Sequence, residues 1–151
     1  KKYSFPATVF LIVSEIGKPG RLSWDQIKEM QGSGLISFGS HTMTHPFLET
    51  ISSDETLAAE ISQSRRMLEQ ELGGPVRTFS YPCGRFTERV KRFVQDAGYS
   101  SAVVTNPGKS CPDDDIFALK RLRISENASN MFIFWAETSG YYNFLRERRH
   151  K

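Results

Sequence analysis

Five short apolar segments are spaced along the chain, and each is shorter than a typical helix. The first, ATVFLIV, is a continuous apolar run rich in β-branched residues, which is typical of a strand buried on both faces of a sheet, whereas the later segments also contain polar residues. The predicted strands are Ala7–Val13, Leu35–Ser40, Val76–Tyr81, Ser101–Thr105 and Phe117–Ile124.

The segments between the first four strands carry apolar residues three or four positions apart, which predicts amphipathic helices. Capping boxes indicate where the first two begin, at Ser23 with Gln26 as partner and at Ser52 with Glu55 as partner. Glycines follow each expected helix and favour its termination. The expected helices cover residues 23–32, 52–72 and 90–97, and residues 129–149 are expected to form two more helical pieces.

Strands that alternate with helices predict an α/β fold with a mainly parallel sheet. Both a β/α barrel and a doubly wound sheet satisfy this pattern. In either architecture the chemistry gathers at the carboxyl ends of the strands, in the loops that lead into the helices. No internal linker divides the chain, so residues 1–151 are expected to form one domain.

Composition narrows the functional classes. The chain is 38% hydrophobic and 25% charged, with a formal charge of +3 and a sequence pI near 9.0. The longest apolar run, Val9–Val13, is far too short to span a membrane, and no basic-then-apolar leader is visible at the start. Because no nucleic-acid-binding motif accompanies the mild basic charge, we expect no nucleic-acid partner. Two cysteines, Cys83 and Cys111, are too few for a disulfide framework.

The second predicted strand runs directly into two histidines, His41 and His45, separated by three residues. On a helical turn this spacing brings both imidazoles to one face, where they can bind a single metal ion. Taken alone, the spacing is a weak signal, and two ordinary polar loop residues would fit it equally well. The location at a strand end favours the metal.

Several motifs around this pair closely resemble those of the polysaccharide deacetylase family, the NodB-like carbohydrate esterases. They occur in the family's order and span most of the chain, so the resemblance is far more specific than one histidine pair. The motifs are PATVFL (6–11), LSWDQIKEM (22–30), GSHTMTHP (39–46), FSYPCG (79–84), DAGYSSAV (96–103) and LKRLRI (119–124).

The resemblance implies a distorted β/α barrel and metal-dependent hydrolysis of N-acetyl groups on a polysaccharide that contains N-acetylglucosamine. It implies a divalent metal, usually zinc, held by one aspartate and two histidines, and His41 and His45 stand at the positions of those histidines. It also implies, by analogy, a protein of the cell envelope or a secreted one.

The family's first motif, a strand ending close to Thr-Phe-Asp-Asp-Gly, has no counterpart here. Its first aspartate is the general base and its second is the metal ligand, whereas this chain starts at residues that resemble the end of the following helix, Lys1–Phe5. We therefore expect a barrel incomplete at its N-terminal strand and helix, without a general base. The acidic run Asp113–Asp115 is interpreted as a solvated loop rather than a replacement ligand.

The third motif departs from the family's usual Arg-Pro-Pro-Tyr-Gly. Ser80 stands at the arginine, and Cys83 stands at the tyrosine whose backbone N–H binds the oxyanion in the family. Since a backbone donor survives a change of side chain, the resemblance implies that Cys83 N–H takes this role, with a packing thiol as the alternative. Tyr81, Pro82 and Gly84 are expected to contact the substrate.

Arginine positions near the expected site are ambiguous. Arg77 faces away from Ser80 if the third strand alternates regularly. The family's late motif usually carries a histidine acid, but the fifth strand offers Arg121 and Arg123 instead. Their side chains point either into the barrel mouth or to solvent, and the solvent-facing interpretation is slightly favoured.

Three functional interpretations stay open at this stage. The first is a deacetylase, the second is a catalytically impaired remnant that binds glycans, and the third is one half of a split enzyme that needs the missing Asp-Asp segment. A barrel lacking a strand exposes two sheet edges. A homodimer that closes this gap is therefore a further expectation.

Overall fold

The computed structural model describes residues 4–105, 115–122, 124 and 129–139. Cys111, Asp113, Asp114, Arg123 and the second expected C-terminal helical piece lie outside the described residues.

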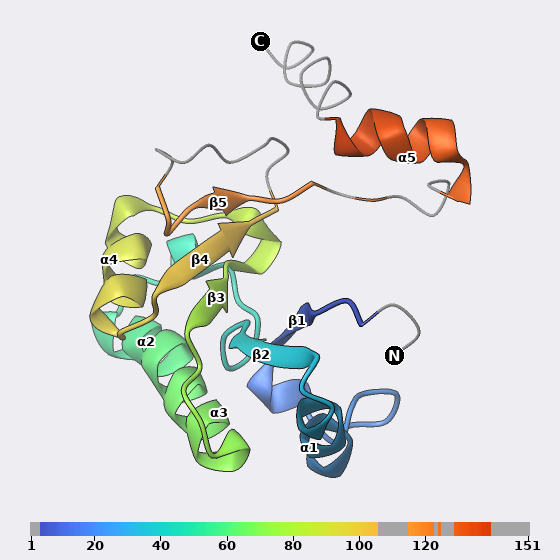
Figure 1. Ribbon diagram of the computed structural model, residues 1–151. Helices are drawn as coiled ribbons and strands as arrows, with labels where there is room; N and C mark the ends of the chain where they lie inside the picture. Colours follow the sequence, from blue (N-terminus) through green and yellow to red (C-terminus); the bar gives the residue numbers. More distant parts are fainter. Residues whose placement is uncertain (1–3, 106–114, 123, 125–128, 140–151) are drawn as a thin grey trace, which may run out of the picture.

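A five-stranded sheet forms the centre of the fold, with strand order β1-β2-β3-β4-β5 and every neighbouring pair parallel (Figure 1). Each strand therefore leads through a crossover into its neighbour, as the alternating sequence pattern predicts. The strands are β1 Ala7–Leu11, β2 Ile36–Ser40, β3 Thr78–Ser80, β4 Ser101–Val104 and β5 Leu119–Lys120.

The five strands confirm the five predicted segments, although each is shorter than its apolar run. β1 and β5 are the edges of the sheet, so the described strands form an open sheet rather than a closed barrel. β1 and β2 pair along their whole length, from Ala7 opposite Ile36 to Leu11 opposite Ser40. The carboxyl ends of these two strands therefore lie side by side immediately before His41.

Helices α1 to α4 lie along the lower and left sides of the sheet in Figure 1, and α5 lies apart from it. In α1 the expected capping box is present, since Ser23 Oγ accepts from Gln26 N and Gln26 accepts from Ser23 N. The helices are α1 Trp24–Gly32, α2 Asp54–Ala58, α3 Ser64–Leu72, α4 Glu88–Asp96 and α5 Met131–Thr138.

The expected helix over residues 52–72 differs from the structure in two respects. Its cap is Ser53, whose hydroxyl accepts from Thr56 N, so the predicted pairing of Ser52 with Glu55 is wrong by one residue. A π-helical turn, Ala59–Gln63, also separates α2 from α3. Such a turn holds one residue more than an α-helical turn and frequently lies at functional sites.

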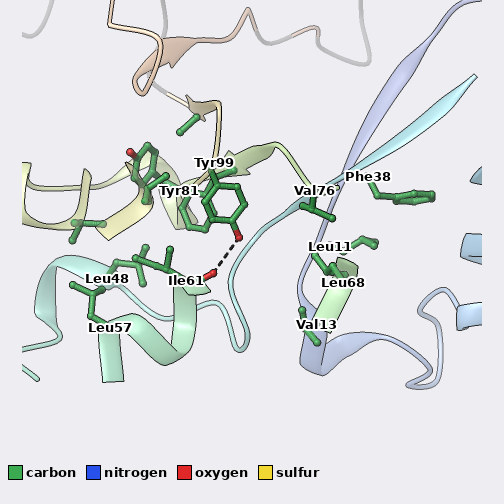
Figure 2. Close-up of a cluster of buried hydrophobic side chains, with 14 of the residues drawn as sticks. Leu11, Val13, Phe38, Leu48, Leu57, Ile61, Leu68, Val76, Tyr81 and Tyr99 are labelled. Atoms are coloured by element: carbon green, nitrogen blue, oxygen red, sulfur yellow. Dashed lines mark hydrogen bonds between the residues drawn. The ribbon is translucent and has the colours of Figure 1, made fainter. Parts of the chain in front are cut away.

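The core lies between the sheet and the helices that follow β1, β2 and β3. Figure 2 shows this cluster, in which the Tyr99 hydroxyl donates to the Ile61 carbonyl at 3.1 Å. The largest fully buried side chains in it include Phe79, Tyr81, Ile27, Leu48, Leu57, Ile61 and Leu68. Within the described part of the chain, no helix has both the length and the apolar character needed to cross a membrane.

Candidate active site

His41 and His45 meet at the carboxyl end of β2. His41 N donates to the Leu11 carbonyl at the end of β1, which fixes the loop where both strands finish. The centroids of the two imidazole rings are 4.7 Å apart, with the ring planes at 77°. The structure thus brings the two predicted metal ligands side by side, although the loop is not a regular helical turn.

Two left-handed residues give this loop its shape. Thr42 has φ 71° and His45 has φ 64°, values that residues other than glycine rarely adopt. Fully buried Thr42 stabilises the turn because its hydroxyl accepts from His45 N at 2.9 Å. The surrounding hydrogen bonds hold a backbone conformation that the free chain would avoid.

The imidazole of His41 is oriented by the neighbouring strand. Its Nδ1 lies 2.6 Å from the carbonyl oxygen of Ser80 at the end of β3. A carbonyl only accepts, so Nδ1 carries the proton and Nε2 of the neutral ring keeps a lone pair for a metal. Burial lowers the pKa of His41, and the charges of His45 and Arg121 lower it further, while the Ser80 carbonyl opposes them.

Arg121 turns toward the site, so the interpretation of it as a solvent-facing residue is wrong. Its Nη2 donates to Ser80 Oγ at 3.3 Å, its Nε donates to the Val104 carbonyl at 3.2 Å, and its guanidinium lies over the ring of Phe10. Arg77, in contrast, is exposed, as strand alternation predicts. The guanidinium of the residue that directly follows β5 therefore reaches Ser80, where the resemblance leads one to expect an arginine.

The third motif forms a tight turn, Pro82–Gly84, directly after β3. Cys83 is exposed and left-handed, with φ 54° and ψ 11°. No described residue accepts a hydrogen bond from Cys83 N–H, whereas Gly84 N and Arg85 N are both paired within the turn. Among the described residues, the backbone donor of Cys83 thus has no acceptor.

The three residues expected to contact substrate are buried. Tyr81 is 0% exposed and stacks on Phe86, and Pro82 and Gly84 are buried beside it. Burial strongly raises the pKa of the Tyr81 phenol, and its hydroxyl has no hydrogen-bond partner within residues 4–105, 115–122, 124 and 129–139. The Tyr81 ring thus belongs to the core and offers no open face to a sugar.

The donor set for a metal is incomplete in the described residues. Two imidazoles converge, but no group of three or more His, Cys, Asp or Glu side chains in this part of the chain could hold an ion. Asp115, from the acidic run, pairs instead with Lys91 at 2.8 Å. The two histidines fit the imidazole half of a zinc site, and a third ligand has to come from outside the described residues.

Sequence reasoning missed one residue that contacts this loop. Glu60, in the π-helical turn, accepts hydrogen bonds from the loop between the two histidines. Its position next to Ile61, in the apolar stripe of the helix, was the available signal, but a charged residue beside such a stripe is usually solvated.

The comparisons with known proteins agree with this geometry. A sequence profile described as "Polysaccharide deacetylase" matches residues 1–102. The chain is 33% identical over 129 residues to "Putative polysaccharide deacetylase YxkH" of Bacillus subtilis, covering 85% of this chain and 46% of that protein. It is 28% identical over 147 residues to "Poly-beta-1,6-N-acetyl-D-glucosamine N-deacetylase" of Staphylococcus epidermidis, covering 88% and 50%.

A solved structure gives the same result. The Streptococcus pyogenes deacetylase PplD, in complex with acetate, superposes with a TM-score of 0.80 and 30% identity, covering 87% of this chain and 59% of that one. The α/β fold of deacetylase type is thus confirmed, as a partial barrel with an open sheet. The chain spans about half the length of the curated relatives named above. By the profile match over residues 1–102, the chain belongs to the polysaccharide deacetylase family.

Proposed function

We propose that the protein containing this chain removes N-acetyl groups from a polysaccharide of N-acetylglucosamine by metal-dependent hydrolysis. The observation that carries the proposal is the imidazole pair, with His41 oriented by Ser80 and its ring 4.7 Å from that of His45. The relatives support the substrate class, because the Staphylococcus epidermidis protein is named for β-1,6-linked N-acetylglucosamine. Acetate, present in the PplD complex, is the acid that such a reaction releases.

His41, through Nε2, and His45 would hold a divalent ion, and zinc suits two imidazoles and a carboxylate. A bound ion of this kind lowers the pKa of water and polarises the amide carbonyl. Within the described residues, no third His, Cys, Asp or Glu joins the two histidines. The remaining ligand and the general base therefore come from elsewhere, in line with the Asp-Asp motif of the family.

The chain's own residues would stabilise the negative charge that develops on the carbonyl oxygen. Cys83 N–H is the proposed oxyanion donor, because it is unpaired among the described residues and lies on an exposed turn after β3. Arg121 adds a positive charge close to the same strand end. A backbone donor needs no particular side chain, which agrees with the presence of Cys83 where the family has a tyrosine.

Several finer expectations stay predictions. Contacts of the polymer with Tyr81, Pro82 and Gly84 would have to involve the backbone, since these side chains are buried. A location in the cell envelope or outside the cell follows from the substrate. A homodimer that closes the open sheet is tested by light scattering coupled to size-exclusion chromatography, and a strict monomer would contradict it.

The proposal is tested by measuring acetate release from acetylated β-1,6- and β-1,4-linked N-acetylglucosamine oligomers with added Zn²⁺. The assay is run on the chain alone and on the chain mixed with a peptide strand that carries the paired aspartates. His41→Asn is the informative variant, because its amide can still donate to Ser80 but offers no Nε2 ligand. We expect it to lower the rate by about 100-fold or more.

The outcomes separate the three interpretations. Release by the chain alone supports a complete enzyme, and release only with the added strand supports a split one. Oligomer binding without release in either format would favour the glycan-binding remnant and contradict the proposed reaction, as would an unchanged rate in His41→Asn.

A further inference from the structure

Glu60 places its carboxylate directly against the backbone between the two histidines. Its Oε2 accepts from Met43 N and from Thr44 N, both at 3.0 Å, and its Oε1 accepts from the Thr44 hydroxyl at 2.7 Å. Only 9% of the residue is exposed. A buried carboxylate that receives three hydrogen bonds from one short segment is a strong and specific tether.

The main chain of the same turn contributes a further link. Met43 N also lies 3.2 Å from the Glu60 carbonyl, so one amide is shared between the side chain and the backbone of this residue. Four residues later, the Ser64 hydroxyl pairs with Ser40 Oγ at 2.8 Å, and Ser40 Oγ accepts from Thr42 N. The helical segment after the histidine loop therefore holds that loop on both sides of His41.

The π-helical turn explains why Glu60 faces inward. The turn Ala59–Gln63 holds one residue more than a regular helical turn, which shifts the phase of the helix, and both Glu60 and Ile61 within it are buried. The irregular turn is thus coupled to the contact with the histidine loop.

The loop itself needs such support. Thr42 and His45 both have left-handed backbone conformations, and Glu60 binds the two residues that lie between them. Without the carboxylate, Thr44 N would lose this acceptor and Met43 N would keep only the longer bond to the Glu60 carbonyl, so the strained turn would relax.

We propose that Glu60 is a positioning residue that holds Met43 and Thr44 in place and thereby sets the convergence of His41 and His45. Glu60 lies in the layer behind the imidazoles and acts through the loop backbone. The expected effect of Glu60 on metal binding rests on the proposed function. The expected effect of Glu60 on the order of the histidine loop does not.

Three variants test the role of Glu60. Glu60→Ala removes the acceptors, whereas Glu60→Gln keeps an amide oxygen that can accept from Met43 N and Thr44 N. Glu69→Ala is the matched control, because Glu69 Oε1 accepts from Val76 N and Arg65 Nε, both at 3.0 Å, in the next helix and away from the histidines. Both carboxylates accept from a backbone N–H, although Glu69 is only half-buried and also pairs with Arg65.

Two readouts are compared. Hydrogen–deuterium exchange of a peptide covering residues 41–47, measured without metal, should become faster in Glu60→Ala and stay near wild type in Glu60→Gln and Glu69→Ala. Zn²⁺ affinity, measured by calorimetry on the chain, should fall by about 10-fold or more in Glu60→Ala and by less than about 3-fold in the other two.

The outcomes are distinguishable. Unchanged exchange of residues 41–47 in Glu60→Ala would overturn the inference, and so would an equal acceleration in Glu69→Ala, which would reveal general destabilisation. If the wild-type chain bound no Zn²⁺ even with the strand that carries the paired aspartates supplied, the proposed metal site would be contradicted, while the exchange experiment would still decide the role of Glu60.

Discussion

The carbonyl oxygen of Ser80 lies 2.6 Å from Nδ1 of His41, so the last residue of β3 orients the first residue after β2. The Ser80 hydroxyl meanwhile accepts from Arg121. One residue thus links an imidazole and a guanidinium that are far apart in sequence. The Ser80 carbonyl fixes the tautomer of His41 but raises the pKa of its ring, whereas the positive charge of Arg121 lowers that pKa and favours the neutral imidazole.

The first prediction concerns the pH dependence of stability in the metal-free chain. The pKa of His41 is lowered in the folded protein, mainly by burial, relative to about 6.5 in the unfolded chain. Between these two values the unfolded chain binds a proton that the folded chain does not. His41 should therefore reduce the free energy of unfolding as pH falls through about 6.5, and its effect should level off below the folded pKa.

Urea unfolding between pH 7.5 and pH 5, with a chelator present, checks this sign. His41→Asn supplies an N–H in the place of Nδ1 and does not titrate, so its stability should fall less steeply over the same window. Equal slopes for the variant and the wild type would show that His41 has the same pKa in both states.

Arg121 provides the second prediction, because its charge lowers the pKa of His41. Arg121→Gln should raise the pKa of the His41 ring, whereas Arg121→Lys keeps the charge and should raise it less. An NMR titration of the imidazole resonances measures both. Arg77→Gln is the control, since Arg77 is exposed. A shift in Arg77→Gln as large as in Arg121→Gln would mean that net charge, rather than proximity, sets the pKa.

The third prediction compares two buried tyrosines. The Tyr81 hydroxyl is buried without a partner among the described residues, whereas the Tyr99 hydroxyl donates to the Ile61 carbonyl. Tyr81→Phe should leave the free energy of unfolding unchanged or raise it slightly, and Tyr99→Phe should lower it by about 1 kcal/mol. Urea unfolding at pH 7 measures both. A clear loss of stability in Tyr81→Phe would place an acceptor, such as a buried water, at its hydroxyl.

Much of the fold could be predicted from local sequence patterns. The first strand was recognisable because a strand buried on both faces needs a continuous apolar run, and the cap at Ser23 was recognisable because its donors and acceptors lie within one turn. The convergence of His41 and His45 could be predicted for the same reason: both residues lie in one short loop at a strand end.

The remaining parts of the site depend on contacts between distant segments. Arg121 reaches Ser80 across 41 positions, and its direction depends on the phase of a two-residue strand that the sequence leaves undetermined. Glu60 faces inward because of a π-helical turn, and the sequence around it carries no proline or glycine to indicate that irregularity. In both cases, tertiary packing determines what a charged residue does.

The last prediction concerns the turn that presents Cys83 N–H. Gly84 has φ +70°, and a Cβ added there would lie 2.8 Å from the backbone N of Thr105. Gly73, which ends α3, has a similar φ of +67°, but no atom lies within 4 Å of an added Cβ. Alanine at Gly73 would add only backbone strain, whereas alanine at Gly84 would add backbone strain and a steric clash, so comparing the two substitutions separates these effects.

We expect Gly73→Ala to lower the free energy of unfolding by about 1 kcal/mol, which reflects the left-handed conformation alone. Gly84→Ala should lower it by about 3 kcal/mol or more, because β4 would have to move away from the turn as well. Chemical denaturation followed by circular dichroism measures the difference. Equal losses at the two positions would mean that the Pro82–Gly84 turn adjusts freely, and a turn with that freedom would be a poor support for an oxyanion donor at Cys83.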